Sequence, residues 1–271
     1  MRSSSGQGSD MSGGRSDGNR GPLAGIGVVV IGDEILSGRR QDRHLAAVTE
    51  RLASRGLVAD WAQILPDRRN SIIDLLRRSR ADEATVFCFG GIGATPDDLT
   101  RACAAEAFER PLVRHPQAVA LIESQFGERA YPKRVLMAEL PEGAALVPNP
   151  VNRVPGFSLD RHFFLPGFPE MAHAMLDTIF TGPLAELGDA TYVEQSLWLM
   201  GASESELVDL MEVFCDAYPK LGLFSLPVYS PENRLLELGF RGERAKVKQA
   251  ISELVAALGE RGLPAYEKRP A

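Results

Sequence analysis

The strongest chemical signal in the sequence is a stretch rich in glycine, threonine and aspartate at positions 90–100. Its glycines carry no Cβ, so the backbone there can turn tightly and approach a ligand closely. Unpaired amides at the start of a following helix carry partial positive charge and suit a phosphate. The residues that we expect to hold the phosphate are Gly90, Gly91, Gly93, Thr95 and Thr100.

Two adjacent carboxylates, Asp97 and Asp98, lie within the same stretch. They would repel a phosphate unless a cation lay between them, and Mg²⁺ bridges carboxylate and phosphate oxygens. For either aspartate alone the alternative is a helix cap, with the glycines serving only the turn. For the whole stretch, ligand binding is the favoured interpretation.

A second acidic stretch runs from Gly32 to Gly38 and contains Asp33 and Glu34 directly after an apolar run. Carboxylates at a strand end, flanked by glycines, are candidate ligands for a metal or a polar group. The alternative is a solvated loop. The candidate metal ligands are Asp33, Glu34, Asp97 and Asp98, of which Asp33 and Asp98 are also the candidate catalytic residues.

A third stretch reads Pro166-Gly167-Phe168-Pro169-Glu170. Gly167 and Pro169 are candidate ligand contacts, because the stretch again follows an apolar run. The alternative is the start of a helix with proline in its first turn. Four arginines near these stretches could bind phosphates: Arg39, Arg40, Arg43 and Arg153. The alternative is that they are only solvated, as most surface arginines are.

Composition excludes several classes of function. The 30 basic and 36 acidic residues give a net charge of −6, so binding of nucleic acid through bulk positive charge is not expected. No apolar run is long enough to cross a bilayer, so we expect no membrane partner. Three sparse cysteines, interpreted as buried apolar residues, fit a reducing cytoplasm, and four scattered histidines disfavour a zinc hydrolase. The cysteines are Cys88, Cys103 and Cys215, and the histidines are His44, His115, His162 and His173.

The elements that position these stretches alternate between strand and helix. An apolar, β-branched run at 26–31 predicts a buried strand, and Asp42 is placed as the N-cap of a helix with a stripe of Leu45, Val48 and Leu52. Further predicted elements are a strand at 57–64, a helix capped by Asn70, a strand at 84–89 and a helix from about Asp98. This order is typical of a parallel α/β sheet, whose ligands bind beyond the carboxyl ends of the strands.

The rest of the chain extends this sheet and then begins a second unit. We predict a helix at 116–126, strands at 135–140, 144–147 and 162–165, a loop at 149–156 and a helix ending near 180. After a linker at 181–190 come strands at 191–199, 221–226 and 234–240 and helices at 203–218 and 243–258. The predicted organisation is a disordered tail at 1–21, a three-layer, mostly parallel α/β domain at 22–180, a small α+β domain at 191–260 and a tail at 261–271.

Together these motifs resemble the molybdopterin-binding domain family of MoaB and Mog, and most of all its CinA-like (competence/damage-inducible protein A) branch. The family motif Gly-Asp-Glu-Leu-Leu-x-Gly corresponds to residues 32–38, and Gly-Gly-Leu-Gly-Pro-Thr-x-Asp-Asp-Leu-Thr corresponds to 90–100. Further motifs match at 149–156, at 165–169 and, in the second unit, at Gly201, Glu204, Ser205 and Leu207.

The resemblance implies a pterin or nucleotide ligand over the glycine loop. In MoaB and Mog relatives the position of Asp98 acts in molybdopterin adenylylation. In CinA proteins the region is linked to a metal-dependent ADP-ribose pyrophosphatase, which implies a hydrolase with Mg²⁺, alone or with K⁺. The resemblance also implies a homo-oligomer, whereas the C-terminal amidase domain of full-length CinA proteins is not expected in this chain.

Some positions depart from the family pattern. The family usually has Asp-x-Asn where this chain has Asp42-Arg43-His44. It usually has glycine at the position of Asn152 and a small residue at the position of Arg153. These departures leave two hypotheses open: a Mg²⁺-dependent phosphoanhydride enzyme, and a non-catalytic pterin- or nucleotide-binding module that has lost turnover. A DNA-processing role is a weaker third, against which the net charge argues.

Overall fold

The computed structural model describes residues 23–188, 191–229 and 234–270, so the predicted tail at 1–21 lies outside the described residues. A six-stranded sheet organises the first part of the chain, in the order β2-β1-β3-β8-β7-β6. The first four strands are parallel, and β7 and β6 run antiparallel at one edge. The strands are β1 (Ile26–Ile31), β2 (Trp61–Leu65), β3 (Thr85–Phe89), β6 (Ala145–Val147), β7 (Gly156–Leu159) and β8 (His162–Leu165).

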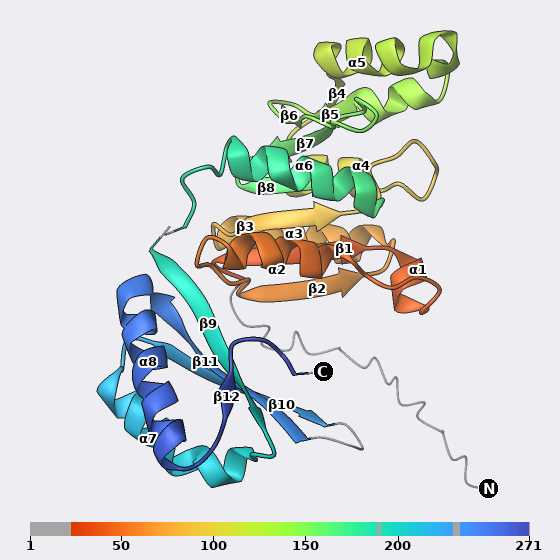
Figure 1. Cartoon of the computed structure of the whole chain (residues 1–271). Helices are drawn as coiled ribbons and strands as arrows, with labels where there is room; N and C mark the ends of the chain where they lie inside the picture. The colour runs from red at the N-terminus through yellow and green to blue at the C-terminus, as the bar shows by residue number, and fades with distance from the viewer. Residues whose placement is uncertain (1–22, 189–190, 230–233, 271) are drawn as a thin grey trace, which may run out of the picture.

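Helices cover both faces of this sheet and make the predicted three layers (Figure 1). The fully buried, β-branched sequence of β1 is typical of a strand covered on both sides, and its side chains alternate between the two layers. Val28 and Val30 pack with α2 (His44–Ala53) and α6 (Pro169–Thr181). Val29 and Ile31 pack instead with α3 (Arg69–Ala81) and α4 (Thr100–Ala107).

An extension beyond the sheet carries the remaining elements of the first unit. They are β4 (Leu112–Arg114), α5 (Pro116–Phe126), the short 3₁₀ helices η1 (Gly127–Ala130) and η2 (Arg134–Ala138), and β5 (Glu139–Pro141), which pairs with β4. This extension lies above the sheet in Figure 1, beyond β6 and β7. Because α5 and η2 pack together, they form a wall beside the loop that follows β3.

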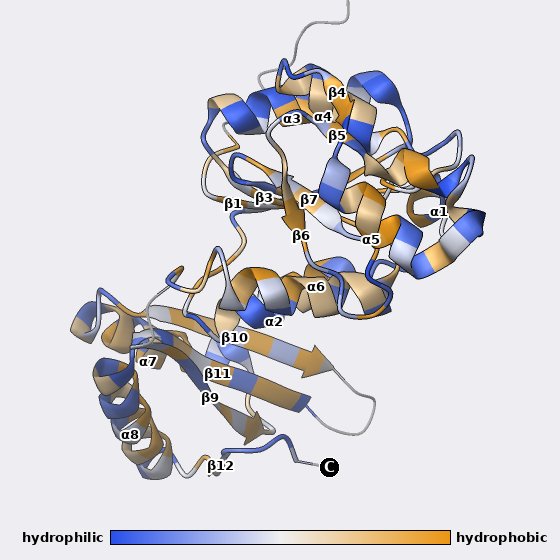
Figure 2. Cartoon of the chain, turned by 90° about the horizontal axis from the view of Figure 1, so that it is seen from above, coloured by the Kyte–Doolittle hydropathy of each residue, from blue (hydrophilic) through white to orange (hydrophobic). Residues whose placement is uncertain are grey.

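The second unit has its own antiparallel sheet, in the order β10-β11-β9-β12, and its own apolar core. Its elements are β9 (Tyr192–Met200), α7 (Glu204–Ala217), β10 (Gly222–Tyr229), β11 (Arg234–Glu243), α8 (Arg244–Glu260) and β12 (Ala265–Tyr266). Helices α7 and α8 lie on one side of the sheet, whose strands carry apolar segments (Figure 2). A capping box of Ser203 and Glu206 begins α7, and β10, which contains Pro227, forms one edge of the sheet.

Several sequence predictions need correction. Residues 135–140 are not one strand: η2 occupies most of them and β5 begins only at Glu139. The Arg101 guanidinium binds the Leu136 and Glu139 carbonyls at this junction. The predicted loop after β1 contains a one-turn helix, α1 (Asp33–Leu36), and β7 was not predicted. The predicted tail at 261–271 contains β12, which pairs with β9.

Smaller corrections concern single side chains. Asp42 does cap α2, since its carboxylate accepts from the backbone N–H groups of His44 and Leu45. Leu45, predicted to face the core, is 37% exposed. Cys88 and Cys103 are buried as predicted, whereas Cys215 is exposed. None of the helices in the described ranges is long and apolar enough to cross a membrane.

Candidate functional site

A cavity of about 440 Å³ lies where the parallel strands end. The segments that follow β1, β2, β3 and β8 all contribute to its wall, and residues of α5, η2 and the loop before β7 close the far side. Its volume falls in the usual range for small-molecule sites, roughly 300–1,000 Å³. The two predicted stretches at 32–38 and 90–100 therefore meet at one site, as does the stretch at 166–169.

The glycine loop is shaped by two residues with positive φ. Gly90 (φ 101°) and Gly91 (φ 67°) adopt left-handed conformations that favour glycine. A Cβ on Gly90 would lie 2.2 Å from the Ile31 carbonyl oxygen, so the loop after β3 presses directly on the end of β1. The backbone at Gly90, Gly91 and Gly93 consequently forms part of the cavity wall, together with Ile92.

Thr100 holds this loop together and does not line the cavity. It is fully buried, its hydroxyl donates to the Gly90 carbonyl at 2.9 Å, and its backbone N–H donates to the Gly91 carbonyl at 2.9 Å. The predicted role of Thr100 as a direct phosphate donor is therefore replaced by a supporting role, since its hydroxyl proton is already engaged inside the fold.

Asp98 lines the cavity and closes a tight turn with Thr95. Its Oδ2 accepts from the Thr95 backbone N–H at 2.8 Å and from the Thr95 hydroxyl. One carboxylate oxygen is thus committed to the loop, and hydrogen bonds of this kind to an ionised carboxylate are strong. The arrangement combines both interpretations of the aspartate, because Asp98 organises the turn and also faces the cavity.

Arg101 lies beneath the loop and is only 8% exposed. Its guanidinium donates to the carbonyls of Gly93 (2.7 Å), Leu136 and Glu139 (3.0 Å). Burial lowers its pKa, and the neighbouring carboxylates of Asp98 and Glu139 raise it. This residue was not predicted from the sequence; it ties the glycine loop to the η2–β5 wall on the far side of the cavity.

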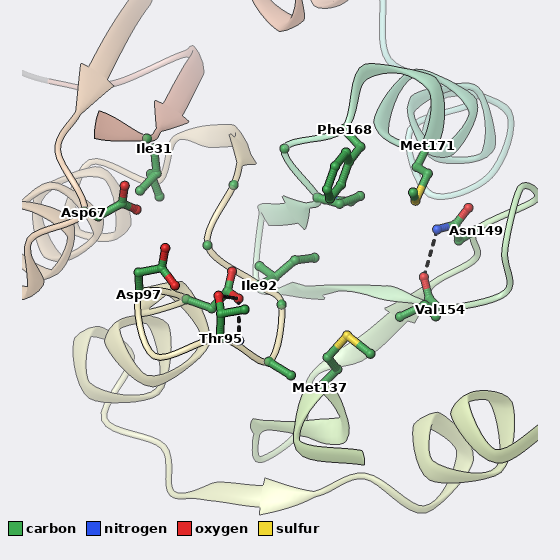
Figure 3. Close-up of a pocket in the computed structure, with 18 of the residues that line it drawn as sticks. Ile31, Asp67, Ile92, Thr95, Asp97, Met137, Asn149, Val154, Phe168 and Met171 are labelled. Carbon is green, nitrogen blue, oxygen red and sulfur yellow. Dashed lines mark hydrogen bonds between the residues drawn. The ribbon is translucent and has the colours of Figure 1, made fainter. Parts of the chain in front are cut away.

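Carboxylates gather on one side of the cavity, where Asp67 and Asp97 are visible in Figure 3. Glu34 and Asp98 also line it, whereas Asp33 does not. The backbone N–H of Asp33 instead donates to Asp67 Oδ2 at 2.9 Å. Asp67 was not predicted as a site residue from the sequence. Its position was the available signal, since Asp67 follows β2 in the way that Asp33 follows β1.

Like charges make this side of the cavity suited to a cation. Burial raises the pKa of Asp67, the Asp33 N–H lowers it, and three nearby carboxylates raise it further. These are Asp33, Glu34 and Asp97. Within the described ranges no three acidic, histidine or cysteine side chains form a ready-made metal cage. The donors fit Mg²⁺ nonetheless, because Mg²⁺ is commonly held by one or two carboxylates together with water and substrate phosphates.

The opposite side of the cavity is apolar, with Met137, Phe168 and Met171 facing the carboxylates across the space (Figure 3). Phe168 is 58% exposed, so part of its ring is accessible. Asn149 supports this side: it is 6% exposed, and its amide donates to Asn152 Oδ1 at 2.8 Å and to the Val154 carbonyl at 3.0 Å. Flexible thioethers and an aromatic ring form a surface on which a planar ring can pack.

The remaining predicted residues divide between two spaces. Gly167 lines the main cavity, and Pro169 lines an adjoining recess of about 60 Å³. Of the family departures, Asn152 lines the main cavity, and Arg43 and His44 line the recess. Arg153 lines neither and adopts a positive φ of 63°.

Comparison with known proteins supports the resemblance inferred from the motifs. The family model described as "Probable molybdopterin binding domain" matches residues 27–186, which include all of the six-stranded sheet except the first residue of β1, and the residues that line the cavity. The chain belongs to this family. The predicted membership in the CinA-like branch is confirmed by relatives named CinA-like protein.

The CinA-like relatives of this molybdopterin-binding domain are longer proteins. One from Gloeobacter violaceus is 32% identical over 69% of this chain and 46% of its own length. Another, from Citrifermentans bemidjiense, is 30% identical over 84% of this chain and 57% of its own length. The chain therefore spans about half the length of these relatives. A solved structure of the protein CinA from Thermoplasma acidophilum is 26% identical, with a TM-score of 0.53 over 58% of this chain and 97% of that one.

Proposed function

We propose that this protein binds a pterin or nucleotide phosphate in the cavity and, with Mg²⁺, hydrolyses a phosphoanhydride in the manner of an ADP-ribose pyrophosphatase. One observation carries the proposal: a bare glycine backbone, a group of carboxylates and an apolar wall face the same 440 Å³ space. A nucleotide or pterin phosphate has the three matching parts, namely an anionic group, a cation-binding phosphate chain and a planar ring.

Each part of the ligand has a proposed partner. The backbone from Gly91 to Gly93 binds a phosphate, since the Gly90 N–H already donates to the Leu165 carbonyl, and the ring packs against Met137 and Phe168. Asp98 and Asp97, with Asp67 and Glu34 beside them, would hold Mg²⁺, which when bound neutralises phosphate charge and polarises the bond to be cleaved. Asp98 then orients the attacking water through the carboxylate oxygen that the turn leaves free.

The substitution Asp98→Asn tests this function. We expect hydrolysis of ADP-ribose with Mg²⁺ to fall at least about 100-fold, because the amide removes the negative charge that binds the cation and orients water. Product release is measured with Mg²⁺ and K⁺ each present and absent. Asp74→Asn is the matched control, since Asp74 is exposed on α3, away from the cavity. Unchanged turnover in Asp98→Asn would refute the mechanism.

A second candidate function is a binding module without turnover. It is favoured by the engagement of Asp98 Oδ2 within its own turn and by the absence of a three-ligand metal cage among the described residues. Calorimetry distinguishes the two: nucleotide or molybdopterin binding with no product release, with or without Mg²⁺, supports the module. Light scattering on the same samples tests the proposed homo-oligomer.

A further inference from the structure

The recess beside the main cavity has the chemistry of an anion site. It shares four lining residues with the cavity, so the two spaces adjoin; they are Ile31, Glu34, Arg40 and Gly167. Its volume of about 60 Å³ exceeds the 10–15 Å³ that one water needs and fits a single small polyatomic group. The recess is therefore of a size that fits one phosphate or a similar ion.

Two arginines, Arg40 and Arg43, line this recess. In the part of the chain that the structure describes, neither guanidinium forms an ion pair or a hydrogen bond. The only carboxylate in the lining is that of Glu34. Asp42 lies nearby, but both of its oxygens accept from the first N–H groups of α2, which partly compensates its charge. Positive charge thus exceeds negative charge in the wall of the recess.

His44 supplies a buried polar atom with no partner. It is 4% exposed, its ring stacks on Phe89 at 4.4 Å, and its Nδ1 has no hydrogen bond. Leaving such an atom unpaired costs free energy, because it has lost its hydrogen bond to water without gaining another. A phosphate in the recess would remove this cost, because its hydroxyl can donate to Nδ1, or its oxygen can accept from a protonated ring.

We propose that the recess is a second anion subsite, formed by Arg40, Arg43 and His44, which binds the terminal phosphate of a diphosphate ligand. The inference rests on the proposed function for the position of the first phosphate on the glycine loop. The two sites are neighbours, since a Cβ on Gly167 would lie only 3.5 Å from the Gly90 Cα. The protein should therefore prefer nucleoside or pterin diphosphates to the corresponding monophosphates.

The test compares ADP with AMP by calorimetry at low ionic strength. We expect the wild-type protein to bind ADP at least about ten-fold more tightly than AMP. Arg43→Gln, which changes the recess alone, should weaken ADP binding about ten-fold and leave AMP binding unchanged, and Arg40→Gln, which changes a residue of both spaces, should weaken ADP binding by at least as much. Arg39→Gln is the matched control, because Arg39 is an exposed neighbour that lines neither space. Thermal unfolding of each variant checks that the fold is retained.

Two results would overturn the subsite: equal affinity of the wild type for ADP and AMP, or ADP binding by Arg43→Gln and Arg40→Gln that matches the Arg39→Gln control. Should the wild type bind neither nucleotide, the nucleotide part of the proposed function fails, and inorganic pyrophosphate becomes the probe. Pyrophosphate binding that Arg43→Gln weakens then supports the subsite on its own, and binding that is absent or unaffected by the substitution refutes it.

Discussion

At the scale of single residues, Gly91 shows why the ligand loop needs glycine. Its φ of 67° is close to that of Gly38 (72°), but a Cβ on Gly91 would lie 2.3 Å from the Thr100 hydroxyl, whereas one on Gly38 would meet nothing within 4 Å. Alanine at Gly38 therefore adds only the cost of a left-handed backbone, roughly 1–2 kcal/mol. Alanine at Gly91 adds a collision with a buried group as well.

We accordingly expect Gly91→Ala to destabilise the fold by at least about 2 kcal/mol more than Gly38→Ala. Urea unfolding of the two variants measures the difference. Equal destabilisation would show that Thr100 moves aside without cost, and that its hydrogen bond to the Gly90 carbonyl is unimportant for the loop.

The sequence predicted the residues of the loop better than their roles. Three glycines after an apolar run indicate a ligand loop, and the structure places Gly90, Gly91 and Gly93 on the cavity. The inward turn of the Thr100 hydroxyl depends on which carbonyl lies beside it, and Asp67 joins the site only because β2 pairs with β1. Neither fact is encoded in local residue order.

At the scale of elements, Arg101 joins α4 to the η2–β5 wall through three backbone carbonyls. Arg101→Met would leave these buried acceptors without their donor. We expect a loss of roughly 3–5 kcal/mol in the free energy of unfolding. Arg77→Met on α3 is the control and should change stability by less than about 1 kcal/mol, because Arg77 is exposed and its ion pair with Glu106 spans 3.6 Å. A small effect at Arg101, measured by urea unfolding, would contradict its bridging role.

The elements differ in how well their local sequence predicts them. Buried parallel strands such as β1 and β3 have continuous apolar sequences that are recognisable locally. Residues 135–140 also have a mostly apolar sequence, yet they divide between η2 and β5, and the carbonyls of Leu136 and Glu139 accept from Arg101, more than thirty positions away. Short elements such as α1 and β12 carry too few residues for a periodic pattern.

At the scale of the whole molecule, buried histidine makes stability depend on pH. His162 is 1% exposed, its Nε2 lies 2.8 Å from the Ser79 hydroxyl, and burial, with a smaller effect of Arg80, lowers its pKa to about 4. The unfolded chain binds a proton near pH 6.5, whereas the folded chain resists it. The free energy of unfolding therefore keeps the full contribution of His162 above about pH 6.5. As the pH falls towards 4, the free energy of unfolding decreases by about 3 kcal/mol in total, because the unfolded chain takes up a proton that folded His162 does not.

His162→Gln should remove this part of the acid sensitivity. Urea unfolding at pH 7.5 and pH 4.5 should show a smaller drop for the variant than for the wild type, even if the variant is less stable at neutral pH. Burial also lowers the pKa of His44 and His173, so a residual drop in the same direction is expected. An identical drop in both proteins would mean that His162 does not titrate on unfolding.

The open edge of the second sheet has a consequence for how this protein behaves at high concentration. An eight-residue strand such as β10, with Leu226 54% exposed, offers a template on which other chains could assemble side by side. Pro227 removes one amide proton from that template and interrupts the regular ladder that fibril growth requires. Replacing Pro227 with a residue that has an amide proton would restore this donor and make the β10 edge more prone to pair with other chains.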